Sequence, residues 1–523
     1  GHATHTKRAG EMPLNSDAES SNDAAKTCLV IGAGAAGLSC ASLLHENGVR
    51  VILLEASNRI GGRCFTSKVG DNKHDLGVWE HGATWLHGVV GNPAFELCDS
   101  LGLVPKGQMA VREAKNGNSA AIAQRKKRGP ARHLRSDGKP IEADDVKAVR
   151  EATSILFSSV EECEEGRPTH ESLGAHVRSA WNAARPALIA KHQNSVDAAV
   201  LDAAWHAAEG LQCAIDGCGD LLDEDSGEVF SSYDEFDGKN VMSRPDLGGF
   251  SRAMEGLAEP LRKAGVLRLG CAAKTIRWAS PKVEVICEDG TTFTADAICI
   301  AVPLEPLKKL VFEPPLPSSQ LAAMNQMACG PVEKIFVLLE RVVQSDDAAA
   351  RVEDFPSTLH LLWTDAATDA AAMTAAVAAG ATGCPSGWCR GLYGLHSDRA
   401  STSASASSTG SENKDRAEEG TLRDHDESST FDHDERVTMV AWLTGECAKA
   451  VSGRSSDELL PELLDGLSSF WAQIPQWRPI ACHSTSWSAN RFISGSYSYP
   501  RAGAPSDVTQ KLSAPLVDES NGD

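Results

Sequence analysis

Residues 27–64 read TCLVIGAGAAGLSCASLLHENGVRVILLEASNRIGGRC, and this stretch decides the fold. The apolar runs 28–31 and 49–54 are each short enough for a buried strand, and between them apolar residues recur at three- and four-residue steps, as in a helix. Asn47-Gly48 ends the helical pattern, because glycine readily closes a helix. Three glycines between the first strand and the helix stand in G-x-G-x-x-G spacing: Gly32, Gly34 and Gly37. The stretch predicts a strand–helix–strand unit of a parallel sheet.

The glycines and the acid that follows them favour a dinucleotide ligand. Gly32 suits a tight turn, Gly34 lets the backbone approach a pyrophosphate, and Gly37 lets the helix pack on the strand. The helix N-terminus offers N–H groups and the positive end of its dipole to phosphate. Glu55 lies 18 residues after Gly37, where an acid can accept hydrogen bonds from a ribose. We predict dinucleotide binding, with a purely structural strand–helix–strand unit as the alternative.

The residues after Glu55 indicate which dinucleotide. Arg59-Ile60-Gly61-Gly62-Arg63 resembles the R-x-G-G-R of flavin enzymes in the amine oxidase superfamily. The resemblance implies FAD as the cofactor, with Arg63 near its phosphates. A solvated surface charge is the alternative for Arg63.

A second motif narrows the resemblance. Residues 80–88, EHGATWLHG, are similar to the G-A-x-W-x-H-G of polyamine oxidases of the spermine oxidase kind. The resemblance implies that the backbone of this segment follows the flavin ring and that His87 faces the substrate. From its chemistry alone, His87 could equally be a core or surface histidine.

A third motif lies near the C-terminal end. Residues 486–499, SWSANRFISGSYSY, resemble the W-x-x-x-x-x-x-x-G-S-Y-S-Y of the same oxidases, so that the resemblance runs from about Cys28 to Leu516. It implies that Trp487 and Tyr497 wall the flavin and the substrate, and Tyr497 can stack on an aliphatic amine or cation. Ordinary core aromatics are the alternative. The family continues with a G-E-A-T-H-like segment beyond Asp523, so we expect residues 1–523 alone to bind FAD weakly and to turn over poorly.

A lysine stands inside an otherwise apolar strand pattern, residues 332–339. Burying Lys334 there is costly unless it has partners. The resemblance aligns it with a lysine that binds a water near flavin N5, where that water can serve flavin reoxidation and imine hydrolysis. A strand-edge lysine facing water is the alternative. Lys334 and His87 are thus the candidate catalytic residues, and Trp487, Tyr497 and His87 the candidate substrate-binding residues.

Ala273 stands where the family usually has a valine in contact with the cofactor. The complete set that the resemblance implies for FAD is Gly32, Gly34, Ala36, Gly37, Glu55, Arg63, Gly82, Ala83, Thr84, Trp85 and Ala273. No metal ligand is expected, because the fifteen scattered cysteines contain no C-x-x-C pair.

The remaining sequence predicts an α/β fold (mixed α+β) in which a Rossmann-like FAD-binding domain is interleaved with a mixed-sheet, helix-covered substrate domain. Residues 141–215 have helical spacing, and residues 283–294 predict a hairpin with a turn at Asp289-Gly290. The expected FAD-binding domain combines 27–90, 243–310 and 485–523, and the substrate domain combines 91–242 and 311–484. Residues 1–26 predict a disordered tail, and the Ser-, Thr- and acid-rich residues 396–436 a disordered insert.

Composition limits the partners. The net charge of −21 argues against general nucleic-acid affinity and suits a cationic substrate. The basic segment 125–135 is expected to be an exposed loop, with a nuclear-localisation or nucleic-acid patch as the alternative. The sequence contains no run of 18 apolar residues, so it does not predict a membrane span. Free, scattered cysteines suit a reducing compartment, and we expect a cytoplasmic or peroxisomal location.

The sequence therefore predicts an FAD-dependent amine oxidase. With O₂ it would oxidise spermine, spermidine or their acetylated forms to an aldehyde, a shorter amine and hydrogen peroxide. A histone-lysine demethylase of the same superfamily and a non-catalytic binding or regulatory relative are the alternatives.

Overall fold

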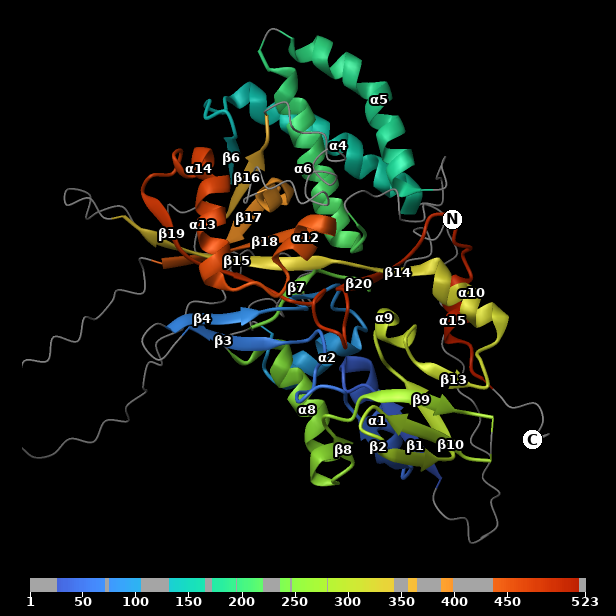
Figure 1. Ribbon diagram of the computed structural model, residues 1–523. Helices are drawn as coiled ribbons and strands as arrows, with labels where there is room; N and C mark the ends of the chain where they lie inside the picture. Colours follow the sequence, from blue (N-terminus) through green and yellow to red (C-terminus); the bar gives the residue numbers. More distant parts are fainter. Residues whose placement is uncertain are drawn as a thin grey trace, which may run out of the picture.

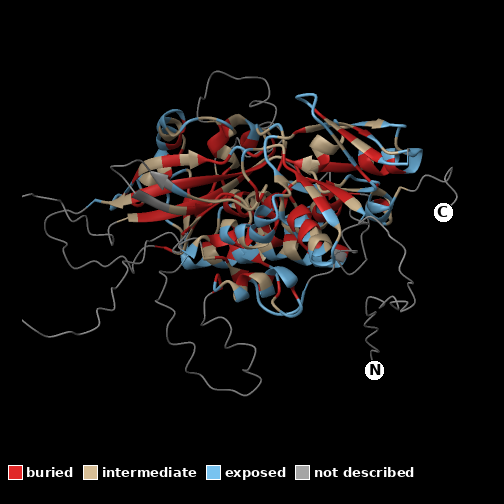
Figure 2. Ribbon diagram, turned by 90° about the horizontal axis from the view of Figure 1, so that it is seen from below, coloured by how far each residue is buried: buried red, intermediate tan, exposed pale blue. Residues whose placement is uncertain are grey.

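The computed structural model describes residues 26–70, 75–104, 131–164, 172–193, 195–219, 236–244, 247–279, 281–342, 356–364, 387–397 and 436–516 (Figure 1). It confirms the α/β class, since parallel and antiparallel sheets are interleaved along the chain with helices that cover them. Buried residues lie both in the strands of these sheets and in the helices that cover them (Figure 2).

The first sheet is the parallel unit predicted from residues 27–64. Its order is β12-β1-β2-β8, and every pair in it is parallel. The strands are β1 (Thr27–Ile31), β2 (Arg50–Leu54), β8 (Leu267–Arg268) and β12 (Ala297–Ile300). Helix α1 (Ala35–Glu46) joins β1 to β2 and packs against α8 (Gly249–Lys263) in one hydrophobic core.

The predicted hairpin forms the middle of a second sheet, β11-β10-β9-β13. Strands β10 (Val283–Cys287) and β11 (Thr292–Ala295) pair antiparallel, and Gly290 takes the positive φ of +86° that the turn requires. Strand β9 (Ala273–Arg277) pairs with β10 on one side and in parallel with β13 (Val311–Glu313) on the other.

A six-stranded sheet, in the order β19-β15-β18-β17-β16-β6, forms the centre of the molecule (Figure 1). Its strands are β6 (Arg132–Arg135), β15 (Val332–Arg341), β16 (Thr358–Leu362), β17 (Gly394–Ser397), β18 (Arg436–Thr444) and β19 (Trp477–Ser484). One face packs in a large apolar core with α12 (Gly445–Val451), α13 (Ser456–Gly466) and α14 (Ser468–Trp471).

Three long helices form a separate core beside this sheet: α4 (Ala143–Glu164), α5 (Leu173–His192) and α6 (Ala198–Asp216). Helix α6 begins at Asp197, whose side chain accepts the Ala199 N–H, and ends at Gly217 in the left-handed conformation. The Trp181 and Trp205 rings stack at 4.8 Å between α5 and α6. The helices predicted for residues 141–215 are therefore confirmed.

Short elements connect the sheets. The strand pairs are β3 (Thr66–Gly70) with β4 (Asp75–Glu80), β5 (Trp85–Leu86) with β7 (Val241–Met242), and β14 (Met327–Gly330) with β20 (Tyr497–Pro500). The remaining helices are α2 (Pro93–Ser100), α9 (Leu304–Leu307), α10 (Ser318–Gln326), α15 (Val508–Ser513) and the 3₁₀ helix η5 (Gly387–Gly391).

Two expected loop segments contain strand residues at their ends. Of the basic segment, residues 132–135 form β6, and Arg135 is buried because it pairs with Asp137 at 2.6 Å; an exposed loop was the wrong interpretation for them. The expected insert 396–436 overlaps β17 at one end and β18 at the other. Residues 125–130, the tail 1–25 and residues 398–435 lie outside the described residues.

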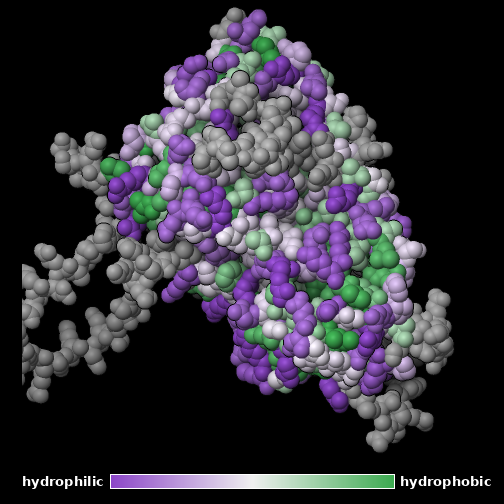
Figure 3. Space-filling model, in the orientation of Figure 1, coloured by the Kyte–Doolittle hydropathy of each residue, from purple (hydrophilic) through white to green (hydrophobic). Residues whose placement is uncertain are grey.

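No helix within the described ranges has both the length and the apolar character needed to cross a bilayer. On the face shown in Figure 3, hydrophilic side chains predominate and the hydrophobic ones form small separate patches.

Candidate active site

The turn between β1 and α1 has the geometry that a pyrophosphate requires. A Cβ on Gly32 would lie 2.4 Å from the Ala301 oxygen, and one on Gly37 would lie 1.8 Å from the Gly32 oxygen, so both positions exclude a side chain. A Cβ on Gly34 would meet nothing within 4 Å, which leaves open space in front of the backbone. Helix α1 begins there with no side-chain cap, and Ala36 in its first turn is exposed. These features suit the approach of phosphate oxygens to backbone N–H groups.

Glu55 fixes the neighbouring part of this turn. Its buried carboxylate accepts the Ala33 N–H at 2.7 Å and the Ser57 N–H at 2.8 Å. Its backbone oxygen accepts the Cys271 N–H at 2.9 Å, which brings the start of β9 and the half-buried Ala273 alongside. A carboxylate has about four lone-pair sites, so Glu55 retains acceptor capacity for ribose hydroxyls.

Replacing Glu55 by arginine is expected to lower FAD affinity at least tenfold. The substitution places a cation beside the ribose position and removes a charged acceptor, a loss of roughly 1.5–3 kcal/mol. Titration of the apoprotein with FAD, followed by flavin fluorescence, measures the effect. Glu55→Gln is the matched control, because it keeps the size of the side chain and one acceptor oxygen. Unchanged FAD affinity in Glu55→Arg would remove the assignment of this turn to the dinucleotide.

Arg63 links the turn to the two later motifs. The segment before it lies along the turn, since the Gly61 N–H donates to the Ala33 oxygen at 2.8 Å. The Arg63 guanidinium donates to the Ser496 oxygen at 2.5 Å, and the Arg63 oxygen accepts the Ala83 N–H at 3.2 Å. Residues from three distant parts of the sequence thus meet at Arg63.

Lys334 is buried on β15 and points at residues 80–84. Its Nζ donates to the Glu80 oxygen at 3.0 Å, the Gly82 oxygen at 2.6 Å and the Thr84 Oγ1 at 2.5 Å. Its Nζ also lies 6.0 Å from the Trp442 ring centroid. The side chain is 6% exposed, so Lys334 does not face water at the edge of a strand.

Trp487 reaches the same segment from the C-terminal motif. Its indole N–H donates to the His81 oxygen at 3.1 Å, and a Cβ on Gly82 would lie 3.3 Å from its Cζ2 atom. Gly82 is also held against Arg63, because the same Cβ would lie 1.6 Å from the Arg63 oxygen. Lys334 and Trp487 therefore converge on residues 80–84, and at Gly82 this segment has no space for a side chain.

A carboxylate that the sequence reasoning missed holds Trp487 in place. Glu333 is fully buried, and its oxygens accept the Trp487 N–H at 3.0 Å, the Ser488 N–H at 2.8 Å and the Thr485 Oγ1–H at 2.5 Å. The Ser452 hydroxyl donates to it at 2.8 Å. The signal was available, because an acid inside an apolar strand has the same burial cost that singled out Lys334.

Two further buried groups flank the segment. The Glu80 carboxylate accepts from the Thr66 hydroxyl at 2.8 Å, the Ser243 hydroxyl at 2.8 Å and the Phe250 N–H at 2.9 Å, while burial raises its pKa. Burial first, then the neighbouring His483 and Lys334, lowers the pKa of His81 to about 3. His81 is therefore a neutral imidazole at physiological pH.

Three candidates are more exposed. Tyr497, 43% exposed, follows Ser496 on β20 and packs closely on the backbone at Gly217. Trp85 is 44% exposed on β5, where it pairs with Met242. His87 is exposed, and its carbonyl accepts from the Asn92 side chain at 3.0 Å.

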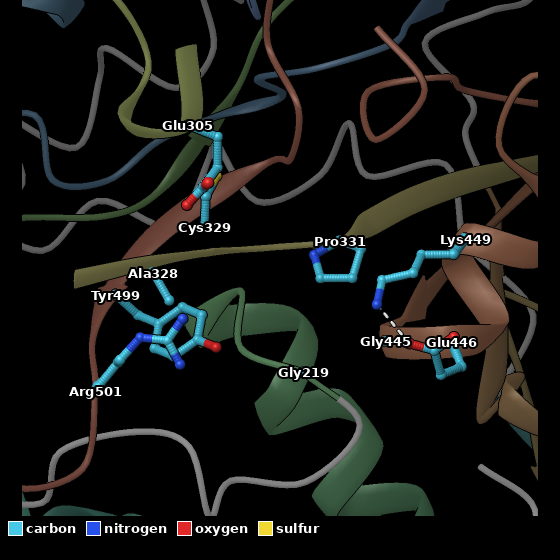
Figure 4. A pocket seen from close by; sticks show the side chains of 10 residues that line it. All are labelled: Gly219, Glu305, Ala328, Cys329, Pro331, Gly445, Glu446, Lys449, Tyr499 and Arg501. Carbon is cyan, nitrogen blue, oxygen red and sulfur yellow. Dashed lines mark hydrogen bonds and ion pairs between the residues drawn. The ribbon is translucent and has the colours of Figure 1, made fainter. Parts of the chain in front are cut away.

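A cavity of about 320 Å³ lies beside the start of β15 (Figure 4). Its lining comprises Gly219, Glu305, Ala328, Cys329, Pro331, Gly445, Glu446, Lys449, Tyr499 and Arg501. The two carboxylates are each paired with a lysine, Glu305 with Lys308 at 2.9 Å and Glu446 with Lys449. With Arg501 added, this lining does not form a negative trap for a polycation.

Comparison with known proteins shows the family to which the chain belongs. A model of the family described as flavin containing amine oxidoreductase matches residues 35–382. The chain is 26% identical to polyamine oxidase 1 of Oryza sativa subsp. japonica over 520 residues, which cover 93% of this chain and 87% of that protein. It is 27% identical to human lysine-specific histone demethylase 2 over 322 residues, which cover 59% of this chain but 34% of the demethylase.

Human peroxisomal N(1)-acetyl-spermine/spermidine oxidase is 25% identical over 371 residues, which cover 64% of each chain. The structure of putrescine oxidase bound to putrescine matches the fold with a TM-score of 0.53 at 16% identity, over 94% of this chain and 92% of that one. The family match extends over most of the sequence and includes helix α1, Glu55, Arg63, residues 80–84 and Lys334. The chain is a member of the flavin-containing amine oxidoreductases, an enzyme family whose cofactor is FAD.

Proposed function

We propose that this amine oxidase acts on polyamines, namely spermine, spermidine or their acetylated forms. The observation that carries the proposal is the convergence of Lys334 and Trp487 on residues 80–84, the segment whose sequence resembles polyamine oxidases. The extent of the alignments supports it. The alignment with polyamine oxidase 1 covers 87% of that protein, whereas the alignment with the histone demethylase covers only 34% of the demethylase. The net charge of −21 suits a polycation.

The reaction consumes amine, O₂ and water, and it yields an aldehyde, a shorter amine and hydrogen peroxide. FAD, when bound, supplies the two-electron oxidation of the carbon beside the reacting nitrogen. Gly32, Gly34, Gly37, Glu55 and Arg63 would hold it, together with Ala36, Ala273 and residues 82–85. The chain's own contribution is to orient both partners and to exclude water from the reacting carbon.

Lys334 is proposed to serve this orientation. An ammonium has three donors, and the three oxygens around Nζ can accept all of them. A water bound to Lys334 Nζ would therefore take the place of one of these three oxygens. Thr84 Oγ1 is the oxygen that can make room, because its side chain can rotate. Trp487 would form one wall of the site and Tyr497 the entrance, while His87 would meet the substrate farther out.

The substrate is tested by peroxide release. Purified protein loaded with FAD is offered spermine, N-acetylspermine or a methyl-lysine histone peptide in a peroxidase-coupled assay. We expect peroxide with the polyamines and none with the peptide. Turnover of the peptide alone would assign the enzyme to the demethylases instead, and no peroxide from any of the three would overturn the proposal. A peroxisomal or cytoplasmic location is proposed with it, supported by the human peroxisomal relative.

A further inference from the structure

One face of the six-stranded sheet carries imidazole and indole rings that neither the cofactor site nor Lys334's hydrogen bonds use. The strand register places them side by side. Trp442 pairs with Lys334 across β15 and β18, and His396 pairs with Val440, two residues before Trp442. His396 pairs with Thr358, two residues before His360. His360 in turn pairs with His133 on β6. Cross-strand partners, and residues two apart, share a face of a sheet.

The opposite face is apolar and closed. Along each strand, the residue next to one of these rings points to this opposite face. Four such residues are at most 2% exposed in the core shared with α12, α13 and α14: Leu134, Leu359, Leu395 and Ala441.

The row itself is more open. Trp442, His396, His360 and His133 are only half-buried, although β17 and β18 are interior strands of the sheet. Helix α6 contacts β16 and β18, and Leu362, which shares this face, is buried in the helical core, so part of the face is covered. The four half-buried residues, termed the histidine row below, form the part of the face that keeps some exposure.

The rings of the row form two contacting pairs, and the second pair lies beside Lys334. His133 and His360 stack with centroids 4.5 Å apart, and His396 meets the edge of Trp442 at 5.5 Å. The Trp442 ring centroid lies 6.0 Å from the Lys334 Nζ. Burial lowers the pKa of His133 and of His396 to about 4 and also lowers that of His360. All three imidazoles are therefore neutral at physiological pH, and each has one ring nitrogen that can accept a hydrogen bond. The Nδ1 of His396 lies 3.3 Å from the Thr358 hydroxyl, so a ligand would meet its Nε2.

We propose that the histidine row binds the distal ammonium groups of a linear polyamine whose reacting end lies at Lys334. The inference rests on the proposed function and specifies how the substrate lies. An ammonium donates to a neutral imidazole nitrogen, and the Trp442 face attracts a cation through its π-electrons. Neighbouring strands are about 4.8 Å apart, and two nitrogens separated by three methylenes are about 5 Å apart in an extended chain. A polyamine that crosses the strands therefore repeats its nitrogens at the spacing of the row.

This arrangement selects for chain length. A short diamine reaches only Trp442 and His396, whereas a longer polyamine also reaches His360 and His133. A monoamine of equal length presents no distal donor to any of the three histidines. The row therefore distinguishes substrates by the number and the position of their nitrogens, with no carboxylate needed at these positions.

The test compares spermine with a secondary monoalkylamine of the same length in which methylenes replace the distal nitrogens. His360→Phe keeps a ring and removes the acceptor, and His360→Gln restores an acceptor. We expect His360→Phe to raise the KM for spermine at least tenfold more than the KM for the monoamine, and kcat for spermine to change less than KM. His360→Gln should recover part of the loss. His396→Gln is a second variant, and circular dichroism verifies that each protein is folded.

His45→Phe, on α1 and away from the sheet, is the matched control and should leave both KM values unchanged. Isothermal titration of each variant with spermine separates this inference from the proposed function. If His360→Phe weakens spermine binding, the histidine row is supported even when no peroxide forms. In that case only the proposed function fails. Peroxide release with an unaltered spermine KM in His360→Phe and His396→Gln overturns the row and leaves the function standing. Absence of both binding and peroxide overturns both.

Discussion

Lys334→Met is expected to slow amine oxidation, flavin reoxidation or both by ~10-fold or more, while FAD stays bound. Methionine keeps the length and the apolar stem of the side chain, but it cannot donate to Glu80, Gly82 or Thr84. Residues 80–84 then lose the group that fixes them, and a positioned acid–base or water-holding group is lost with it. Stopped-flow absorbance of the flavin resolves the two half-reactions. The Glu80 carbonyl loses this donor, whereas the Gly82 oxygen keeps the Thr84 hydroxyl at 3.3 Å, so stability should also fall by roughly 1–3 kcal/mol.

Lys309→Met is the control for this variant, because Lys309 is an exposed lysine on the same chain. It should match the wild type in FAD content, in both half-reactions and in unfolding. Wild-type rates in both half-reactions of Lys334→Met would show that Lys334 has only a structural role.

Glu333→Ala is expected to have the largest effect on stability. The substitution removes an acceptor that four groups share, and among the described residues Glu333 is the acceptor seen for the backbone N–H groups of Trp487 and Ser488. A buried unsatisfied donor costs about 1–3 kcal/mol, so two of them should destabilise the protein by roughly 2–6 kcal/mol. Urea unfolding measures this change.

The same variant should also detach Trp487 from residues 80–84. We expect residues 485–496 to become sensitive to limited proteolysis and FAD retention to fall. Ser452→Ala is the matched control, since it leaves the carboxylate with three donors. It removes one donor to Glu333 and the acceptor of the Ala489 N–H, and it should cost about 1 kcal/mol. Equal unfolding free energies for Glu333→Ala and Ser452→Ala would show that the shared carboxylate does not hold the segment.

The sequence was informative where the determinants are local. The turn formed by Gly32, Gly34 and Gly37 could be predicted, because the glycines, the apolar strands and Glu55 all lie within one short stretch. The helix α13 shows the limit of such reasoning. Ser455 caps it in a reciprocal pair with Glu458, although the adjacent Ser456 has the same side chain. Both serines suit the position, and only the backbone geometry decides between them.

The surroundings of Lys334 could not be predicted in the same way. Two of its partners are backbone carbonyls, at Glu80 and Gly82, and a carbonyl leaves no signal in residue type. The histidine row was likewise hidden, because β6 and β16 pair although more than 200 residues separate them in the sequence. Which imidazoles become neighbours depends on strand order, which periodicity does not specify.

The contacts at Glu333 and Lys334 have a consequence for biosynthesis. Lys334 reaches 254 residues back to Glu80, and Glu333 reaches 154 residues forward to Trp487. A ribosome adds about 5–20 residues per second, so several seconds or more separate the emergence of β15 from that of Trp487. Throughout this interval the nascent chain exposes a carboxylate that has no backbone N–H groups to accept from. Chaperones that bind incomplete chains therefore have a defined period in which to act, and it ends when the C-terminal motif leaves the ribosome.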